Sequence, residues 1–388
     1  MPDCRLSSDV DAPEPAVVTN TWTGDAEYMV WAKLQSGARF NLATSGVANL
    51  SLGELPARLE DLELTASGAY GYAPLVEALA AHVGVAPENV VVPGGGTSFA
   101  NHLALAGLVG TGDEVLVETP SYSLMAAVAR YLGATVTEFP RRAEDGFALD
   151  AGEIRSRLSP RTRVIVITNL HNPTSVQAGE EALRSVGEIA REAGCKVLVN
   201  EAYREAVFDN TPRSAFHLGP EFVVTSSLTK VYGLSGLRCG WILAEPALAR
   251  AFWRLNDLFG VNAPHAVERL AVVALRDLGA IRERARRLLT ANRPLLRGFL
   301  ESREDLEVVR APWGTTVFPR LRRGSVEDLA ARLRSAYETS IVPGRFFGAE
   351  QHFRIGIGGE TSMVREGLLR LARALDEQHH GTPRLPQT

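Results

Sequence analysis

The sequence predicts an α/β fold in which a mostly parallel central sheet is flanked by helices, together with a smaller α+β unit. Between about residues 70 and 244, short β-branched runs alternate with segments of helical periodicity, which is the pattern of a parallel sheet covered by helices. In such sheets, ligands bind beyond the carboxyl ends of the strands. The expected strands are Asn89–Val92, Glu114–Glu118, Thr135–Phe139, Arg163–Thr168, Lys196–Asn200, Phe222–Thr225 and Gly240–Leu243. The expected helices between them include Ser98–Val109, Ser123–Leu132 and Glu180–Ala193.

A long helical stretch follows these strands, from about Ala263 to Leu300. We expect it to be interrupted near Leu278–Gly279 and at Pro294, because proline lacks the N–H that a helix interior needs. From about residue 303 to 376, short strands and a helix over Ser325–Tyr337 indicate the smaller α+β unit.

The expected domain organisation follows from these elements. Residues 1–18 are rich in Pro, Asp and Ser, and we expect them to lack fixed structure. Residues 47–265 are expected to form a large domain, and residues 19–46 and 266–377 a small one. Residues 378–388 are expected to be a frayed tail.

Composition narrows the class of protein. The 388 residues carry a formal net charge of −4 and are 45% apolar, which is ordinary for a soluble globular protein. Nothing in this balance favours nucleic acid or an anionic membrane surface as a partner. No run is long enough to span a bilayer, and the N-terminus does not resemble a signal peptide. Cys4, Cys195 and Cys239 stand apart without metal-ligand spacing, so we expect no metal site, no disulfide and a cytoplasmic location.

Lysine chemistry has few candidates in this chain. Of 41 basic residues, three are lysine, namely Lys33, Lys196 and Lys230, and arginine does not supply a free amine nucleophile. Lys230 follows a predicted strand, and its apolar and aromatic flanks favour the desolvated amine that Schiff-base chemistry needs. Ser227 and Arg238 offer a hydroxyl and a guanidinium, which together suit a phosphate.

The pattern Ser227-x-x-Lys230, followed by Arg238, resembles the signature of class I/II aminotransferases, which are fold-type I pyridoxal-phosphate enzymes. The resemblance extends over about Asn41–Leu375, because further landmarks follow in the family's order. It implies a fold-type I PLP-transferase with pyridoxal 5′-phosphate (PLP) as cofactor. It also implies that Lys230 holds PLP as a Schiff base, while Ser227 and Arg238 bind the phosphate.

Two more segments match cofactor-binding positions of this family. A glycine-rich turn that opens a helix lets backbone N–H groups approach a phosphate, and Gly95-Gly96-Thr97 lies at the family's phosphate cup. Tyr122 lies where the family stacks an aromatic ring on the pyridine ring of PLP. The resemblance therefore assigns these residues to cofactor binding.

A third match is the segment His171-Asn172-Pro173-Thr174-Ser175, which resembles the family's HNPTG loop. The resemblance implies that Asn172 donates a hydrogen bond to the phenolic oxygen of PLP. Ser175 replaces the usual glycine. We expect His171 to be a structural neighbour of the site and not a catalytic base.

The segment Asn200-Glu201-Ala202-Tyr203 departs from the family pattern. Tyr203 matches the tyrosine that bonds the phenolic oxygen, but Asn200 replaces the aspartate that ion-pairs the pyridine nitrogen. A neutral amide does not supply that charge. Glu201 is a poor substitute because neighbouring residues of a strand point to opposite faces. Either the enzyme works with a weaker electron sink, or the chain is an altered or attenuated form.

The substrate carboxylate also has candidate ligands. Arg354 resembles the arginine that grips this group, and a planar guanidinium suits a bidentate contact. Gly46 matches the position where a glycine backbone approaches the same carboxylate. Tyr70 resembles the tyrosine that reaches the phosphate of the partner subunit, although the segment also aligns with the glycine after that tyrosine.

The leading functional hypothesis is a PLP-dependent aminotransferase acting between an α-amino acid and a 2-oxo acid, with Lys230 and Tyr203 as catalytic residues and a homodimer as the assembly. The SGVANLSLGEL and LTKVYGLSGLRCGW segments also resemble capreomycidine-synthase-like proteins. A PLP-dependent cyclase, eliminase or oxidase of specialised metabolism is therefore a second hypothesis. A PLP-binding regulator without catalysis is a third. The sequence does not identify the amino acid, although Tyr28, Trp31 and Arg39 are candidates for its pocket.

Overall fold

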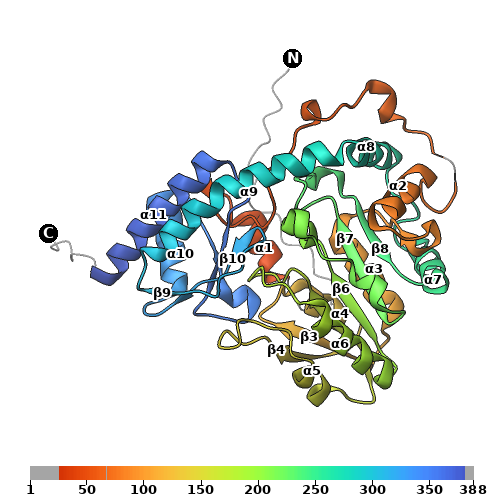
Figure 1. Ribbon diagram of the computed structural model, residues 1–388, viewed down its shortest axis with the longest axis horizontal. Coiled ribbons are helices and arrows are strands. Elements are labelled where there is room, and N and C mark those ends of the chain that lie inside the picture. Colours follow the sequence, from red (N-terminus) through yellow and green to blue (C-terminus); the bar gives the residue numbers. More distant parts are fainter. Residues whose placement is uncertain (1–25, 67, 381–388) are drawn as a thin grey trace, which may run out of the picture.

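All seven expected strands pair into one central sheet in the computed structural model, which describes residues 26–66 and 68–380 (Figure 1). In sheet order the strands are β2 (Val90–Val91), β8 (Gly240–Leu243), β7 (Phe222–Ser227), β6 (Lys196–Asn200), β5 (Thr162–Thr168), β3 (Glu114–Thr119) and β4 (Thr135–Pro140). Neighbours from β7 to β4 pair in parallel, whereas β8 is antiparallel to β2 and β7. The mostly parallel α/β fold predicted from the sequence is thus confirmed.

Helices flank this sheet, and the inner strands are apolar for that reason. The helices of this part are α2 (Ala73–Val83), α3 (Gly96–Leu108), α4 (Leu124–Tyr131), α5 (Ala151–Arg157), α6 (Glu180–Ala193), α7 (Pro246–Asn256) and α8 (His265–Arg276). α3 packs against β7 and β8, α4 against β3 and β4, and α6 against β6. In β5, the run from Val164 to Ile167 is almost fully buried.

Four loops meet at the carboxyl edge of the sheet, because parallel strands end on the same side. These loops follow β3, β5, β6 and β7. Strand pairing places Asn200, the last residue of β6, level with Thr168 of β5 and Thr225 of β7. The segments expected to carry the chemistry therefore start from neighbouring strands.

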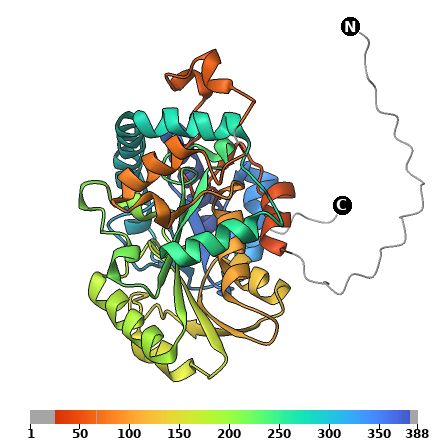
Figure 2. The ribbon, with the colours of Figure 1, turned by 90° about the vertical axis from the view of Figure 1, so that its right-hand side faces the viewer.

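The N-terminal and C-terminal segments together build a smaller part. Its strands are β1 (Phe40–Asn41), β9 (Leu306–Glu307), β10 (Thr316–Val317), β11 (Arg320–Leu321), β12 (Thr339–Ser340), β13 (Val342–Pro343) and β14 (Phe353–Gly356). Its helices are α1 (Glu27–Leu34), α9 (Leu278–Glu301), α10 (Val326–Tyr337) and α11 (Thr361–His380). β1 pairs with β12, and β14 lies between β10 and β13. Figure 2 shows α1, in red, beside the blue C-terminal elements.

The two parts have separate apolar cores. The core around the central sheet includes Ala271 and Ala274 of α8 and extends to Ile281. The core of the smaller part includes Leu42, Val47 and Phe208 and continues from Ala285 of α9 to Leu375. Along α9, the chain therefore passes from one core to the other between Ile281 and Ala285. The expected domain boundary at residue 265 stays a prediction.

Of three expectations about the helices, one agrees with the structure and two differ from it. The expected break near Leu278–Gly279 is present, since α8 ends at Arg276 and α9 begins at Leu278. The expected break at Pro294 is wrong, because α9 continues through it to Glu301. α11 also includes residues 378–380, which were expected to belong to a tail. The expectation for residues 1–18 lies outside the described residues.

Within residues 26–66 and 68–380, we find no helix with the length and apolar character required to cross a membrane.

Candidate active site

Lys230 follows β7 at the carboxyl edge of the sheet, and the segment around Gly46 packs directly against it. The backbone N–H of Val47 donates to the Lys230 carbonyl at 2.8 Å. A Cβ atom at Gly46 would lie 3.0 Å from the same carbonyl oxygen, so a side chain at this position would crowd the Lys230 backbone. Glycine thus permits the close approach of the N-terminal segment to the lysine.

The Lys230 amine lies in a hydrogen-bonded group with two hydroxyls. Lys230 Nζ is 3.0 Å from Ser45 Oγ, and Tyr203 Oη is 2.9 Å from the same oxygen. Ser45 and Tyr203 are both buried. Ser45 thereby joins Lys230 to Tyr203, which comes from the turn after β6.

A cradle for an anion forms at the start of α3. Thr97 Oγ1 donates to Ser227 Oγ at 2.6 Å, and Arg238 Nη2 donates to the Gly95 carbonyl at 2.7 Å. Gly95 and Gly96 have positive φ angles, and a Cβ atom at Gly96 would lie 2.9 Å from the Arg238 guanidinium. Two hydroxyls, a guanidinium and a helix N-terminus suit a phosphate monoester. These residues therefore fit the phosphate group of PLP.

Arg354 is a fully buried cation on β14 whose hydrogen-bond partners are neutral. Its Nη1 donates to Asn172 Oδ1 at 3.0 Å, and its Nη2 donates to the Ala43 carbonyl at 2.8 Å and to Tyr28 Oη at 3.1 Å. Within the described parts of the chain, no carboxylate forms an ion pair with it, and its Nε has no acceptor. A buried unpaired charge is unfavourable, so the site suits an anionic ligand.

The loop that carries Asn172 is tied to the strands of the smaller part. Ser175 has a φ of 63°, and its Oγ donates to the Thr316 carbonyl at 2.9 Å. Because β10, which contains Thr316, pairs with β14, this bond fixes Asn172 relative to Arg354. Ser175, which stands where the family has glycine, thus anchors the Asn172 loop to β10.

His171 has both ring nitrogens engaged. Nδ1 is 2.7 Å from Thr174 Oγ1, and Nε2 is 2.7 Å from the Pro120 carbonyl. Burial, together with the positive charge of Arg141, lowers the pKa of His171 well below its usual value. The ring is neutral and supports the loop structurally.

Tyr122 lies under the N-terminal helix α1. Its ring meets Tyr28 edge to face at 5.3 Å, and its hydroxyl donates to Met29 Sδ at 3.2 Å. Burial raises the pKa of Tyr122. For Tyr28, burial opposes ionisation, but the charges of Arg354 and Lys230 outweigh it and lower the pKa of the phenol. α1 therefore brings an aromatic cover to the site.

Asn200 and Glu201 point in different directions. Asn200 Oδ1 accepts the backbone N–H of Ala202 at 3.1 Å. Glu201 accepts the N–H of Ala215 at 2.7 Å and pairs with Arg204 Nε at 3.1 Å, and it is fully enclosed. This agrees with the expected alternation along β6, and it leaves Glu201 unable to replace the family's aspartate.

Tyr70 is not joined to this group of residues. Its hydroxyl donates to Asp257 at 2.9 Å, its ring lies 6.0 Å from Trp253, and more than half of its surface is exposed. The proposed contact with the partner subunit stays a prediction.

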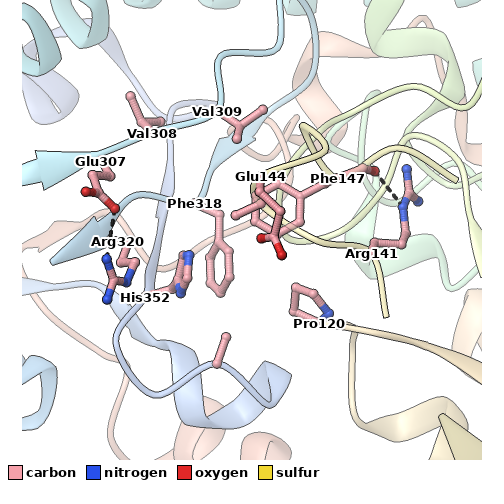
Figure 3. A pocket seen from close by; sticks show the side chains of 12 residues that line it. Pro120, Arg141, Glu144, Phe147, Glu307, Val308, Val309, Phe318, Arg320 and His352 are labelled. Atoms are coloured by element: carbon pink, nitrogen blue, oxygen red, sulfur yellow. Dashed lines mark hydrogen bonds and ion pairs between the residues drawn. The ribbon is translucent and has the colours of Figure 1, made fainter. Parts of the chain in front are cut away.

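A separate cleft of about 580 Å³ lies between the two parts of the molecule (Figure 3). Pro120 and Phe147 line it from one side, and Phe318 and His352, whose rings stack at 4.8 Å, line it from the other. None of the residues expected to bind cofactor or substrate lines this cleft. It is therefore distinct from the Lys230 site.

Sequence reasoning missed two contributors to the site. Ser45 was not among the expected site residues, yet it contacts the lysine amine. Tyr28 was an unassigned pocket candidate, yet it contacts Arg354. Neither residue lies in a motif that specifies a long-range contact. The available signals were that Ser45 directly precedes Gly46 and that Tyr28 lies in a segment with further aromatic residues.

Comparison with known proteins identifies the family. Residues 58–371 match aminotransferase class I and II, and the chain belongs to this family of PLP-dependent enzymes. Capreomycidine synthase of Streptomyces vinaceus is 31% identical over 359 residues, which cover 89% of this chain and 92% of that protein.

Two solved structures are also similar. A PLP-dependent aminotransferase from Streptococcus suis 89-1591 has a TM-score of 0.85 and 25% identity, covering 91% of this chain and 97% of that one. The PLP-dependent cyclase OrfR has a TM-score of 0.81 and 26% identity, covering 96% and 100%. The chain is thus similar both to a protein described as an aminotransferase and to one described as a cyclase.

Proposed function

We propose that the chain is a PLP-dependent aminotransferase that moves an amino group between an α-amino acid and a 2-oxo acid. The observation that carries this proposal is the position of Lys230 Nζ, 3.0 Å from Ser45 Oγ, which also contacts Tyr203 Oη at 2.9 Å. A lysine held in this way at the carboxyl edge of the sheet is placed to react with a carbonyl group. Membership of the class I and II family supports the same function.

Binding is divided between two sets of residues. Thr97, Ser227 and Arg238 hold the cofactor phosphate at the start of α3. Arg354 binds the substrate α-carboxylate and gains the negative partner that it lacks in the described chain. Asn172 accepts a hydrogen bond from Arg354 at 3.0 Å through its Oδ1, so its Nδ2 is the group that would donate to the phenolic oxygen of PLP.

Lys230 is the residue that transfers the proton. When bound, PLP withdraws electrons from the Cα–H bond of the amino acid. The free Nζ of Lys230 would then accept the Cα proton as a base and deliver it, as an acid, to the C4′ carbon of the cofactor. Ser45 holds Nζ by a hydrogen bond between these transfers and is itself held by Tyr203 Oη, and the aromatic cover from α1 excludes water.

A second candidate is a PLP-dependent cyclase, eliminase or oxidase acting on an amino acid. Asn200 favours it, because a weaker electron sink suits reactions in which electrons leave Cα toward another bond or toward oxygen. The similarity to capreomycidine synthase and to the cyclase OrfR also favours it.

Single-turnover incubation tests the proposal. The holoenzyme is mixed with individual amino acids without any 2-oxo acid, and products are quantified by mass spectrometry. Transamination yields one equivalent of 2-oxo acid per subunit together with pyridoxamine phosphate, and then stops. Continued formation of a cyclised, eliminated or oxidised product supports the second candidate. Tight cofactor binding without any product from a complete amino-acid set supports a non-catalytic regulator.

We infer a cytoplasmic protein, because Cys195 and Cys239 are buried free thiols, as expected in a reducing compartment.

A further inference from the structure

Asn200 is held rigidly at the edge of the sheet where the cofactor ring is proposed to lie. Its Cα pairs with Thr168 on one side and Thr225 on the other. Its own carbonyl accepts the N–H of Asn169 at 2.9 Å. The residue retains 8% of its surface. With the backbone fixed on both sides, the side-chain amide is the group left to meet a ligand.

One hydrogen bond sets the orientation of this amide. Oδ1 accepts the backbone N–H of Ala202 at 3.1 Å. Turning the amide by half a rotation would direct the NH₂ group at that N–H, so that two donors would face each other. The N–H of a buried residue would then lack an acceptor, which is unfavourable. The local backbone therefore selects one orientation.

The opposite end of the amide, Nδ2, is a hydrogen-bond donor. Within the described chain, Nδ2 of Asn200 has no hydrogen-bond partner, and it is not among the fully enclosed atoms that lack one. Its two N–H bonds are consequently available to a ligand. An amide nitrogen donates and does not accept.

We propose that Asn200 donates a hydrogen bond from Nδ2 to the ring nitrogen of PLP and thereby keeps that nitrogen unprotonated. This inference rests on the proposed function and on the family position of Asn200, where an aspartate usually meets the pyridine nitrogen. A protonated ring nitrogen is itself a donor and would face a second donor in Nδ2. Where the family has an aspartate that attracts a proton to the ring nitrogen, this chain thus has an amide donor that excludes that proton.

The adjacent carboxylate does not reverse this preference. Glu201 is held instead by the Ala215 N–H and by Arg204, at 2.7 and 3.1 Å. Asn200 therefore contacts the cofactor itself and sets the protonation of its ring nitrogen without touching the substrate.

Nitrogen-15 NMR of the holoenzyme, loaded with PLP labelled at the ring nitrogen, tests the proposal. The wild-type protein is expected to show the chemical shift of an unprotonated pyridine at neutral pH and at the lowest pH that preserves the fold. In Asn200→Asp, the carboxylate still accepts the Ala202 N–H but offers an acceptor to the ring, so the shift should move to the protonated range. Glu201→Gln is the matched control and should leave the shift unchanged.

A protonated shift in the wild-type holoenzyme at neutral pH would overturn the inference, whether or not the variants fold. An unprotonated shift that persists in a folded Asn200→Asp holoenzyme would also overturn it, since Asn200 would then not be the cause. Failure of the wild-type protein to bind PLP through Lys230, seen by mass spectrometry after borohydride reduction, would instead reject the proposed function and this inference with it.

Discussion

Lys230 has two possible competitors for the cofactor, and their surroundings differ from its own. Lys33 is exposed on α1, and Lys196 donates to the Pro220 carbonyl at the start of β6, away from the carboxyl edge. We expect Lys230→Ala to lose the borohydride-reducible bond between PLP and protein completely. Mass spectrometry of the reduced protein measures this, with Lys196→Ala as the control that keeps the bond. A stable adduct in Lys230→Ala would contradict the assignment.

Ser45 holds the lysine amine, so its hydroxyl should matter for proton transfer more than for binding. We expect Ser45→Ala to lower kcat about tenfold, corresponding to about 1.4 kcal/mol, with little change in KM. Ser45→Thr keeps the hydroxyl and should retain more activity. Steady-state kinetics of both variants at several pH values separate an effect on kcat from an effect on KM. An equal loss in both variants would indicate that the contact is one of packing.

Asn200→Asp should accelerate the step that breaks the Cα–H bond. A carboxylate opposite the ring nitrogen stabilises the ring proton by charge, and a protonated ring draws electrons from Cα more strongly. We expect the half-reaction rate to rise by about tenfold or more, with a smaller effect on substrate binding because Arg354 supplies that contact. Single-turnover kinetics with fully bound cofactor measure it. An unchanged or lower rate would contradict the electronic role of Asn200.

At the scale of elements, the 3-10 helix η4 (Arg204–Asn210) is tied to α2 and to the lysine loop through Glu205. This carboxylate lies 2.8 Å from His82 Nε2 and accepts from Tyr232 Oη at 2.5 Å. Burial opposes its ionisation, but His82, Arg204 and Tyr232 outweigh burial and lower the pKa of Glu205 from 4.5 to about 2. The charged form of Glu205 thus stabilises the fold.

A pH-dependent stability difference follows from this lowered pKa. Above the pKa of an unfolded glutamate, the full contribution of Glu205 is present, and it disappears as pH falls toward about 2. We expect Glu205→Gln to lose roughly 2–3 kcal/mol of unfolding free energy at neutral pH and progressively less in acid. Denaturant unfolding at several pH values measures this. The exposed Glu188→Gln serves as control, and a constant difference across pH would count against the ion pair.

The elements that the sequence predicted well are those with a local signal. The inner strands β5 and β6 contain continuous apolar runs, and α6 has the bounds that its periodicity indicated. Pro294 misled the prediction because tertiary contacts hold α9 on both sides of it. Asn292 donates to the carbonyls of Ile357 and Gly359, and Phe299 and Leu300 are buried. Packing of this kind outweighs a local helix-breaking preference.

For the candidate site, the order of the strands predicts which residues meet at one edge of the sheet. Lys230, Ser227, Asn172 and Tyr203 follow the carboxyl ends of neighbouring strands, so topology alone brings them to one edge. Ser45 reaches Lys230 across 185 residues of sequence. The path of the N-terminal segment is set by its pairing with the C-terminal strands, and no local pattern encodes that pairing.

At the scale of the whole molecule, one surface exposes large apolar side chains. Leu59 and Leu64 are 84% and 83% exposed, and Leu258 is 77% exposed. The two segments are neighbours, since Tyr70 bonds to Asp257 and Arg269 of α8 donates to the Glu60 carbonyl. In Figure 1 the first segment, in orange, lies above α8 at the edge of the molecule. Exposed apolar patches of this kind mark interaction surfaces.

We expect this surface to join two copies of the chain in a homodimer. Light scattering of the PLP-bound protein at micromolar concentration should give twice the monomer mass. Leu258→Asp should shift the equilibrium toward monomer, because a charge would be buried without a partner, whereas Leu369→Asp, at an exposed leucine of α11, should not. If the dimer places Tyr70 near the partner's phosphate cradle, as the family resemblance implies, the monomeric variant should also bind PLP more weakly. A monomeric wild-type holoenzyme would reject both the interface and this role of Tyr70.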